Sequence, residues 1–344
     1  MKGMTSAARG SGSEHAKYPE EWVLDGQLLA RATITRAALV LLAAAAPGAH
    51  AEYLVSLADG PVTVIRGASL SQASEGTRLY DADIVETGEG RSAQLEDDAG
   101  TVLALGPGTR IMLGDQVAHP RERATAMSIS LLTGWLKAAR VVGAPTPPGR
   151  TLSIEMPLVT VQPGNGASSS PWSLVATTVK RVAAFAEAGD SALAVLNSDG
   201  GKATLVVLHA GQYAEHATGA PLRVQPRAPA EFVAVMPVAF RDPLIAVSRR
   251  LTSRHELPPA ARAIDYADVS DWLTSDFAAR RGFVKRFSPR LKSPEFRAQI
   301  DAHLDSLPQW RPILHPPPSS KPHVQPQAEP RYRDKPGHDD VDAH

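Results

Sequence analysis

Short apolar runs, many of them β-branched and about five residues long, recur from residue 52 to about residue 225, with turn residues between them. Their spacing of roughly ten residues, without helical patterns in between, is typical of an all-β sandwich or roll. Alternating apolar and polar positions in several runs predict one buried and one wet face. We expect strands at residues 61–67, 84–87, 92–95, 101–105, 109–113, 128–132, 152–155, 158–161, 182–186, 193–196 and 203–208.

The same pattern predicts particular core and turn positions. Leu103, Ile111 and Trp135 fall at apolar positions of the runs, so we expect them to be buried. Glycines between the runs should lie in turns, several with positive φ, because glycine adopts that backbone conformation without strain. These turn glycines are Gly88, Gly100, Gly134 and Gly211.

The periodicity changes after residue 228, where helical spacing begins. Residues 265–279 predict a helix with Val269, Trp272, Leu273 and Phe277 on one face. Ser293 as N-cap and Pro294 at the first helical position predict a second helix start. Its apolar face would carry Phe296, Ile300, His303, Leu304 and Leu307, and Pro308 would end it. We expect this helical segment to pack on the β region, because it is too short to form a stable core alone.

The N-terminal part contains one strongly apolar run, residues 37–46, preceded by Arg31 and Arg36. It is too short to span a bilayer as a helix and is followed by small residues, which predicts a secretory signal peptide. Cleavage after Ala51 would leave Glu52 as the first mature residue, with Ala49 as the other small residue of the cleavage site. An alanine-rich core helix is the alternative.

The segments at the two ends of the chain do not suit a folded core. Residues 1–30 are polar and acidic, unlike a signal-peptide n-region, so we expect translation to start near Leu28; a cytoplasmic stub on an uncleaved anchor is the alternative. The last segment holds seven prolines and few large apolar side chains, which predicts disorder. The expected division is 1–30 dispensable extension, 31–51 signal peptide, 52–228 β domain, 229–315 helical region and 316–344 disordered tail.

Composition narrows the function classes. Lys+Arg and Asp+Glu both number 36, so net charge gives no reason to expect a nucleic-acid partner. With no cysteine, disulfides, thiolate metal sites and a cysteine nucleophile are excluded. The sequence contains no nucleophile elbow, phosphate-binding glycine loop or His-Glu-x-x-His motif, so we predict no catalytic residues, cofactor or metal. His209 and His216 are expected at the surface.

Charge is nevertheless distributed unevenly. Residues 81–98 hold seven acids against Arg91, and their spacing is interpreted as a solvated strand edge. Residues 280–297 hold seven bases against Glu295, interleaved with phenylalanines. Three interpretations stay open for the bases: a wet helical face, docking onto the acidic strand, and binding of an anionic envelope polymer or lipid headgroup. The candidate basic interaction patch is Arg280, Arg281, Lys285, Arg286, Arg290 and Lys292. We expect Arg280, Lys285, Arg286 and Arg290 to lie on the outside.

Several stretches between residues 54 and 215 follow one another in a characteristic order. They are a strand ending in Arg66–Gly67, a stretch ending in Thr87–Gly88, the hairpin 95–105 with the turn 106–109, the stretch 131–136, the strand 156–161 and the turn 208–212. This series resembles the FecR-domain family of bacterial periplasmic proteins. Ala82 stands where the family usually has glycine, and Ala99 interrupts its usual Asp-Gly turn. The ending, 271–314, is similar to a tail found on some secreted members.

The resemblance implies an antiparallel β-sandwich or β-roll with a small helical C-terminal appendage. The best-known relatives are transmembrane sensors that pass an outer-membrane iron-transport signal to a sigma factor through a cytoplasmic helical domain. Only about thirty residues precede the predicted signal peptide here, so that role is not carried over. We expect a non-enzymatic periplasmic module that binds or scaffolds in the envelope. Its partner would be an envelope protein or an anionic cell-wall polymer, without nucleic acid and without a stable membrane span after cleavage. A signal-transducing regulator is the alternative; an envelope hydrolase would need a constellation that the sequence lacks.

Overall fold

The computed structural model describes residues 53–114, 126–140, 151–164, 170–196, 203–217, 219–277 and 279–316. The predicted extension, the signal peptide with Ala49, Ala51 and Glu52, and the predicted tail beyond residue 316 lie outside these residues. Residues 49–344 belong to one compact unit, and the domain boundaries expected within it remain predictions.

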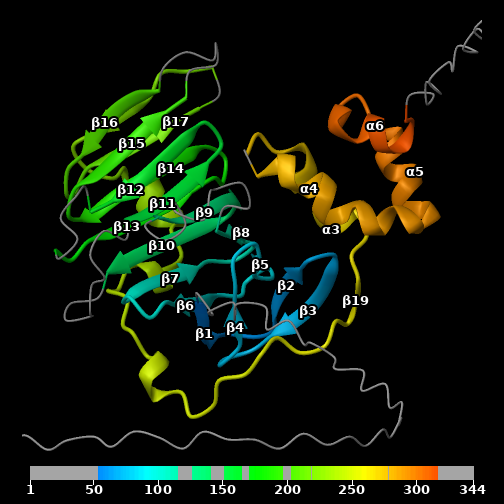
Figure 1. Ribbon diagram of the computed structural model, residues 1–344. Coiled ribbons are helices and arrows are strands. Elements are labelled where there is room, and N and C mark those ends of the chain that lie inside the picture. Colours follow the sequence, from blue (N-terminus) through cyan, green and yellow to red (C-terminus); the bar gives the residue numbers. More distant parts are fainter. Residues whose placement is uncertain are drawn as a thin grey trace, which may run out of the picture. The chain divides into compact units, whose positions relative to one another are not determined.

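The described strands form two sheets (Figure 1). Sheet A has nine strands in the order β18 (Arg223–Gln225), β17 (Tyr213–His216), β14 (Val182–Ala188), β13 (Ser173–Thr177), β10 (Trp135–Arg140), β7 (Thr101–Leu105), β6 (Ala93–Glu96), β1 (Tyr53–Ala58) and β4 (Arg78–Leu79). Sheet B has ten in the order β16 (Thr204–Leu208), β15 (Ser191–Val195), β12 (Val159–Pro163), β11 (Thr151–Met156), β9 (Ala126–Thr133), β8 (Arg110–Leu113), β5 (Ile84–Glu86), β2 (Val62–Arg66), β3 (Ser69–Ala73) and β19 (Arg262–Ala263).

The chain builds both sheets in the same direction, because successive strands and hairpins alternate between them. Hairpin β6–β7 joins sheet A, β8–β9 joins sheet B, and β13–β14 and β15–β16 repeat the alternation. Among the described strand pairs only β9–β11 is parallel. The first strands therefore lie at one end of the sandwich, and β16 and β18 lie at the other.

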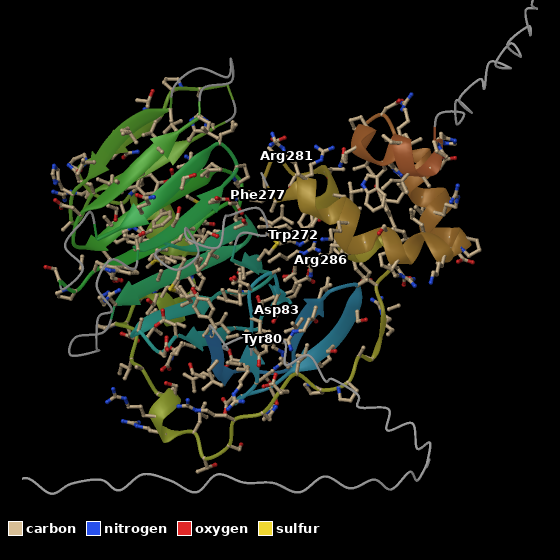
Figure 2. The ribbon with its side chains drawn as sticks, viewed as in Figure 1. Tyr80, Asp83, Trp272, Phe277, Arg281 and Arg286 are labelled. Carbon is tan, nitrogen blue, oxygen red and sulfur yellow. The ribbon has the colours of Figure 1, made fainter. Side chains whose placement is uncertain are left out.

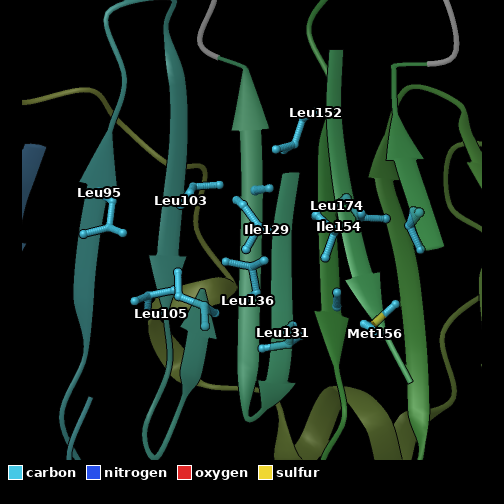
Figure 3. Packing of buried hydrophobic residues seen from close by; sticks show 14 of the residues in the cluster. Leu95, Leu103, Leu105, Ile129, Leu131, Leu136, Leu152, Ile154, Met156 and Leu174 are labelled. Atoms are coloured by element: carbon cyan, nitrogen blue, oxygen red, sulfur yellow. The ribbon is translucent and has the colours of Figure 1, made fainter. Parts of the chain in front are cut away.

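Side chains of both sheets meet in one apolar core (Figure 3). Leu95, Leu103 and Leu136 come from sheet A, whereas Ile129 and Ile154 come from sheet B. Leu103 and Ile111 are fully buried, as predicted. The expected mainly β fold with a small helical appendage is confirmed, and all eleven predicted strands are present. Strands with many alanine, serine or charged residues, such as β3, β10 and β13, were not predicted, because their local pattern is weak.

Trp135 is also buried, but it faces away from this core. It packs with Phe232 of α2 (Ala230–Val235), the ring centroids lying 5.4 Å apart, and Tyr213 packs on the same Phe232 ring at 4.9 Å. Met236 and Phe240 extend this second cluster on the outer face of sheet A. The burial of Trp135 therefore depends on a segment about a hundred residues downstream in the chain.

That segment, residues 226–263, is termed the strap. It contains α2 and the 3-10 turns Val238–Phe240 and Ser248–Arg250, and it runs back along sheet A to the first strands. Lys137, fully buried on β10, donates from Nζ to the carbonyls of Phe240 (2.8 Å) and Asp242 (2.9 Å) and pairs with Glu187 (2.7 Å). A buried ammonium with three oxygen partners holds the strap at mid-sheet.

Further along, the strap meets β6 and then β4. Glu96 accepts from the backbone amides of Val247 (2.7 Å) and Ser248 (3.0 Å), and the Arg78 amide donates to the His255 carbonyl (2.9 Å). Strand β19 then pairs with β3 and becomes the outermost strand of sheet B. The strap thus runs from the outer face of sheet A to the edge of sheet B at β3.

The helical region follows as α3 (Tyr266–Thr274), α4 (Arg280–Phe287), α5 (Pro294–Ala302) and α6 (Arg311–Leu314), with 3-10 turns at Ser288–Lys292 and Pro308–Trp310. Its buried aromatic residues pack with Ile65, Ile84 and Met112 on the outer face of sheet B, which confirms the predicted attachment. Ser293 caps α5 as predicted, its hydroxyl accepting from the Phe296 amide. None of the helices in the described ranges is long and apolar enough to span a bilayer.

The helix predicted over residues 265–279 is wrong in its length. It ends at Thr274, where Ser275 becomes extended, and both its amide and its hydroxyl bond back to the Trp272 carbonyl. Phe277 therefore leaves the helix but still packs near Trp272, with ring centroids 5.9 Å apart. The helix predicted to reach Leu307 also ends early, at Ala302, although Leu307 is buried.

Candidate functional site

The predicted acidic and basic segments meet where the helical region covers sheet B (Figure 2). The acidic segment forms the turn Tyr80–Asp83 and strand β5, which lies between β2 and β8 in the interior of sheet B. The interpretation of these acids as a solvated sheet edge is therefore wrong. Strand β5 has neighbours on both sides, and its one acid, Glu86, pairs with Arg110, whereas Glu89 beyond the strand is exposed.

Asp83 is the central acid, with 1% of its surface exposed. Its carboxylate accepts two hydrogen bonds from Arg66, at 2.9 and 2.7 Å, and one from the Tyr80 amide at 2.9 Å. The turn that presents it places Ala82 at φ +68°, in the left-handed region that glycine adopts more easily. Ala82 is thus held in a strained conformation, and its carbonyl has a specific partner.

That partner is Arg286 of α4. Its guanidinium donates to the carbonyls of Ile65 (2.8 Å), Gly67 (2.8 Å) and Ala82 (2.7 Å), all in the β region. Burial lowers the pKa of Arg286 to about 10, so the side chain stays charged at neutral pH, and the nearby Asp83 opposes this shift. One planar cation thus satisfies three carbonyls at strand ends and joins the helical region to sheet B.

Two further ion-pair clusters fasten the surrounding segments. Arg110 on β8 pairs with Glu86 (2.8 Å) and reaches Asp271 of α3 (2.8 Å), and it donates to the Asp268 carbonyl (2.6 Å). Burial raises the pKa of Glu86 despite this partner. On the strap, Glu256 accepts from the Tyr80 hydroxyl (2.8 Å), and this bond lowers the pKa of the Glu256 carboxyl.

The six bases of the predicted interaction patch do not form one surface. Arg286, predicted to lie outside, is only partly exposed, because it donates to three carbonyls of the β region. Arg290 donates to the Ile264 carbonyl (2.6 Å) and pairs with Asp265, and Arg280 donates to the Ser306 carbonyl. The remaining three are exposed: Arg281, Lys285 and Lys292. As a binding patch, the set of six remains a prediction.

All four predicted turn glycines lie outside the strands. Gly100, Gly134 and Gly211 have positive φ, whereas Gly88 begins a turn in which Gly90 takes that conformation. Gly134 also requires glycine for space, because a Cβ there would lie 2.5 Å from the Cα of Thr109.

The opposite end of the sandwich carries a cleft that the sequence did not predict. It has a volume of about 410 Å³ and lies between the last strands of the two sheets. The described residues that line it are almost all apolar or small: Val195, Leu196, Thr204, Val206, His216, Gly219, Ala220, Pro221, Leu222 and Val224. His216, expected at the surface, is only 9% exposed, because β17 turns it toward the cleft end. His209 is exposed, as predicted, and faces Asp190 at 3.2 Å.

Among the described residues, no group of three or more His, Cys, Asp or Glu side chains is placed to hold a metal ion. The titratable groups with strong partners, such as Asp83, Glu96 and Arg286, bond to the chain itself. What this arrangement supplies is a braced β scaffold with one open apolar end.

Comparisons with known proteins found similarity only to solved structures, and that similarity is weak. No family model and no curated protein matches it. Two crystal structures of "a putative anti-sigma factor" from Parabacteroides distasonis, at 2.50 and 1.65 Å resolution, match with a TM-score of 0.33 and 11% sequence identity. Each alignment covers 44% of this chain, and it spans 62% and 63% of the two solved chains.

Proposed function

We propose that this chain is a non-enzymatic protein of the FecR-domain type that acts in the periplasm as a binding or scaffold module of the cell envelope. One observation carries the proposal. The buried aromatic groups of the helical region and several charged groups, among them Arg286, contact the chain itself, whereas the cleft at the far end of the sandwich is lined, among the described residues, almost entirely by apolar or small side chains. An open apolar end on a braced scaffold is suited to binding a partner.

The partner favoured by this distribution is a protein of the envelope. An anionic polymer would need a concentrated cationic surface, and half of the predicted basic patch is bonded internally. The periplasmic location is supported by the sequence between residues 31 and 51, with its basic flank, short apolar run and small residues.

Location is tested by fractionating cells that express the full chain with a C-terminal tag. We expect the tagged protein in the periplasmic fraction, beginning at Glu52. Recovery of the whole chain from the cytoplasm would overturn the periplasmic part of the proposal.

Binding is tested by retention of the purified chain on two matrices: envelope fragments with their proteins, and sacculi stripped of protein by protease. We expect retention on the first and little on the second. A double variant at two exposed bases, Arg281→Ser with Lys285→Ser, should be retained equally. Absence of retention on both matrices would contradict an envelope-binding role. Altered expression of a sigma-factor regulon in a deletion strain, without any retention, would favour the regulator instead.

A further inference from the structure

Strand β16 is an open sheet edge with unusual exposure of apolar side chains. It pairs only with β15 and is the outermost strand of sheet B, so alternate backbone groups on its other side have no strand partner among the described residues. Leu205 is 77% exposed and Val207 is 45% exposed, and the strand Thr204–Leu208 carries no charge. Natural proteins usually protect such an edge with charges, proline, a bulge or a covering segment.

The cleft lies directly beside this edge. Thr204 and Val206 of β16 line it from sheet B, and Val224 of β18 lines it from sheet A. A strand added to β16 would continue sheet B, so every second side chain would point between the sheets, where the cleft is. The edge offers backbone hydrogen bonds and the cleft offers room for side chains, and the two together define binding by strand addition.

We propose that β16 accepts an extended segment of another protein as an additional strand, and that the inward side chains of this segment fill the cleft. This rests on the proposed function and names the kind of partner. The segment is uncharged and apolar at alternate positions, because His216 is the single ionisable residue among the described residues that line the cleft. A charged side chain would lose hydration there without gaining an opposite charge.

A second copy of this chain fits the edge less well. In an antiparallel β16–β16 pair the inward residues of each copy, among them Val206 and Leu208, already face their own core. Such a pair would leave both clefts unfilled. The cleft therefore favours a free strand over self-association.

The probe is a fluorescein-labelled peptide, KSVTVTVSK, with blocked termini. Its three valines share one face, and its two terminal lysines, added for solubility, lie beyond the five residues that β16 can pair. Its binding to the full chain is measured by fluorescence anisotropy. We expect saturable binding. Methylation of the backbone amides of the three valines should weaken this binding at least about tenfold, because the methyl groups block hydrogen bonds to the edge.

Three protein variants separate edge from cleft. Leu205→Lys places a charge on the edge and should weaken binding about tenfold, as edge lysines do in natural sheets. Ala220→Trp occupies the cleft and should weaken binding while leaving the edge free. Val238→Lys is the matched control, because Val238 is also highly exposed (71%) but lies on the strap, and it should bind like the native chain.

Equal affinity of Leu205→Lys and the native chain, or of the methylated and unmethylated peptides, would overturn the inference. The inference would also be overturned if the native chain did not bind the peptide but formed a dimer in sedimentation, and if Leu205→Lys abolished that dimer. A second copy of the chain would then occupy the edge. If Leu205→Lys is still fully retained on envelope fragments, the proposed function stands and strand addition fails. If the native chain is not retained at all, the proposed function fails first.

Discussion

At one end of the sandwich the strap contacts the edges of β3 and β4, whereas at the other end no described segment pairs with the outer side of β16. The strap bonds to the edge strand β4 through the Arg78 amide, and its strand β19, two residues long, pairs with the edge of β3. The open edge β16 has five residues and no charge. In Figure 1 the strap passes from sheet A round to β19 before the helices begin.

The two ends of one sandwich therefore differ in how their edge strands are contacted by the rest of the chain. The strap contacts the edges at the first end, and Arg286 joins the helical region to sheet B through three carbonyl partners. Nothing comparable lies at β16 in the described residues, although an exposed apolar edge invites unwanted pairing. We infer that the closed end contributes stability and the open end contributes binding.

The largest effect is expected from truncating the aromatic packing at the closed end. Phe283 is fully buried, stacked on Phe287 at 5.5 Å and edge-on to Trp272 at 6.4 Å. Phe283→Ala should lower the free energy of unfolding by about 3–5 kcal/mol, through lost burial and a cavity. Leu205→Ala at the open end should change it by less than about 0.5 kcal/mol, because the side chain is exposed. Urea titrations followed by tryptophan fluorescence measure both; similar losses would mean that the two ends do not differ.

The turn glycines should show the next largest contrast. Gly134→Ala should cost about 3 kcal/mol, because positive φ strain adds to the clash with Thr109. Gly211 lies in the turn between β16 and β17, and a Cβ added there would meet no atom within 4 Å. Gly211→Ala should therefore cost only about 1 kcal/mol of backbone strain. The same urea titrations compare them. A larger loss for Gly211→Ala would show that the open end is packed as tightly as the middle.

A smaller loss of stability is expected from replacing Arg286. Arg286→Met keeps most of the apolar length but leaves three carbonyls without this donor, which should cost about 1–3 kcal/mol. Lys285→Met, at the exposed neighbour, is the control and should be nearly neutral. Limited proteolysis between residues 265 and 310 should accelerate only in Arg286→Met.

In the native protein the segment 265–310 should also resist cleavage at high salt, because aromatic packing is insensitive to screening. Fast cleavage of the native segment would identify an independent arm.

The smallest effect concerns the strap at Glu96. Burial alone would raise the pKa of this carboxyl, but bonds from Ser248 and Val247 outweigh it, so the folded-state pKa is lowered. A lowered folded-state pKa stabilises the fold above the ordinary glutamate value of about 4.3, and this contribution is lost as pH falls through the folded-state value. Amide hydrogen exchange of Val247 and Ser248, corrected for intrinsic rates, should therefore increase on acidification. Glu96→Gln should exchange faster at neutral pH and show a weaker pH dependence; identical profiles would mean that Glu96 does not hold the strap.

The strands and caps could be predicted from sequence because their causes are local. Short apolar runs between turn residues identify 101–105 and 109–113 as two core strands. The residues Ser293 and Pro294 mark a helix start through their own preferences. Gly134 could be assigned to a turn for the same reason, since its neighbours in sequence are two apolar runs.

The candidate site could be predicted only in part. The uneven charge identified both segments that meet at the junction, but local sequence could not show that β5 is an interior strand or that Arg286 faces three carbonyls. A signal for Arg286 existed in its position between Phe283 and Phe287, which places it beside a buried helix face. Nothing similar marked Glu96, whose partners lie about 150 residues away in the chain.

The sequence by itself determined the β pattern, the turn positions and the helix caps, because these follow from the preferences of neighbouring residues. Tertiary structure alone decided which charges are buried, which edge the strap covers and which edge stays open. Those outcomes depend on groups brought together from distant parts of the chain, such as Lys137 with Phe240 or Arg286 with Gly67. A short window of sequence contains only one partner of each pair, so it cannot show whether the tertiary structure brings the other partner into contact.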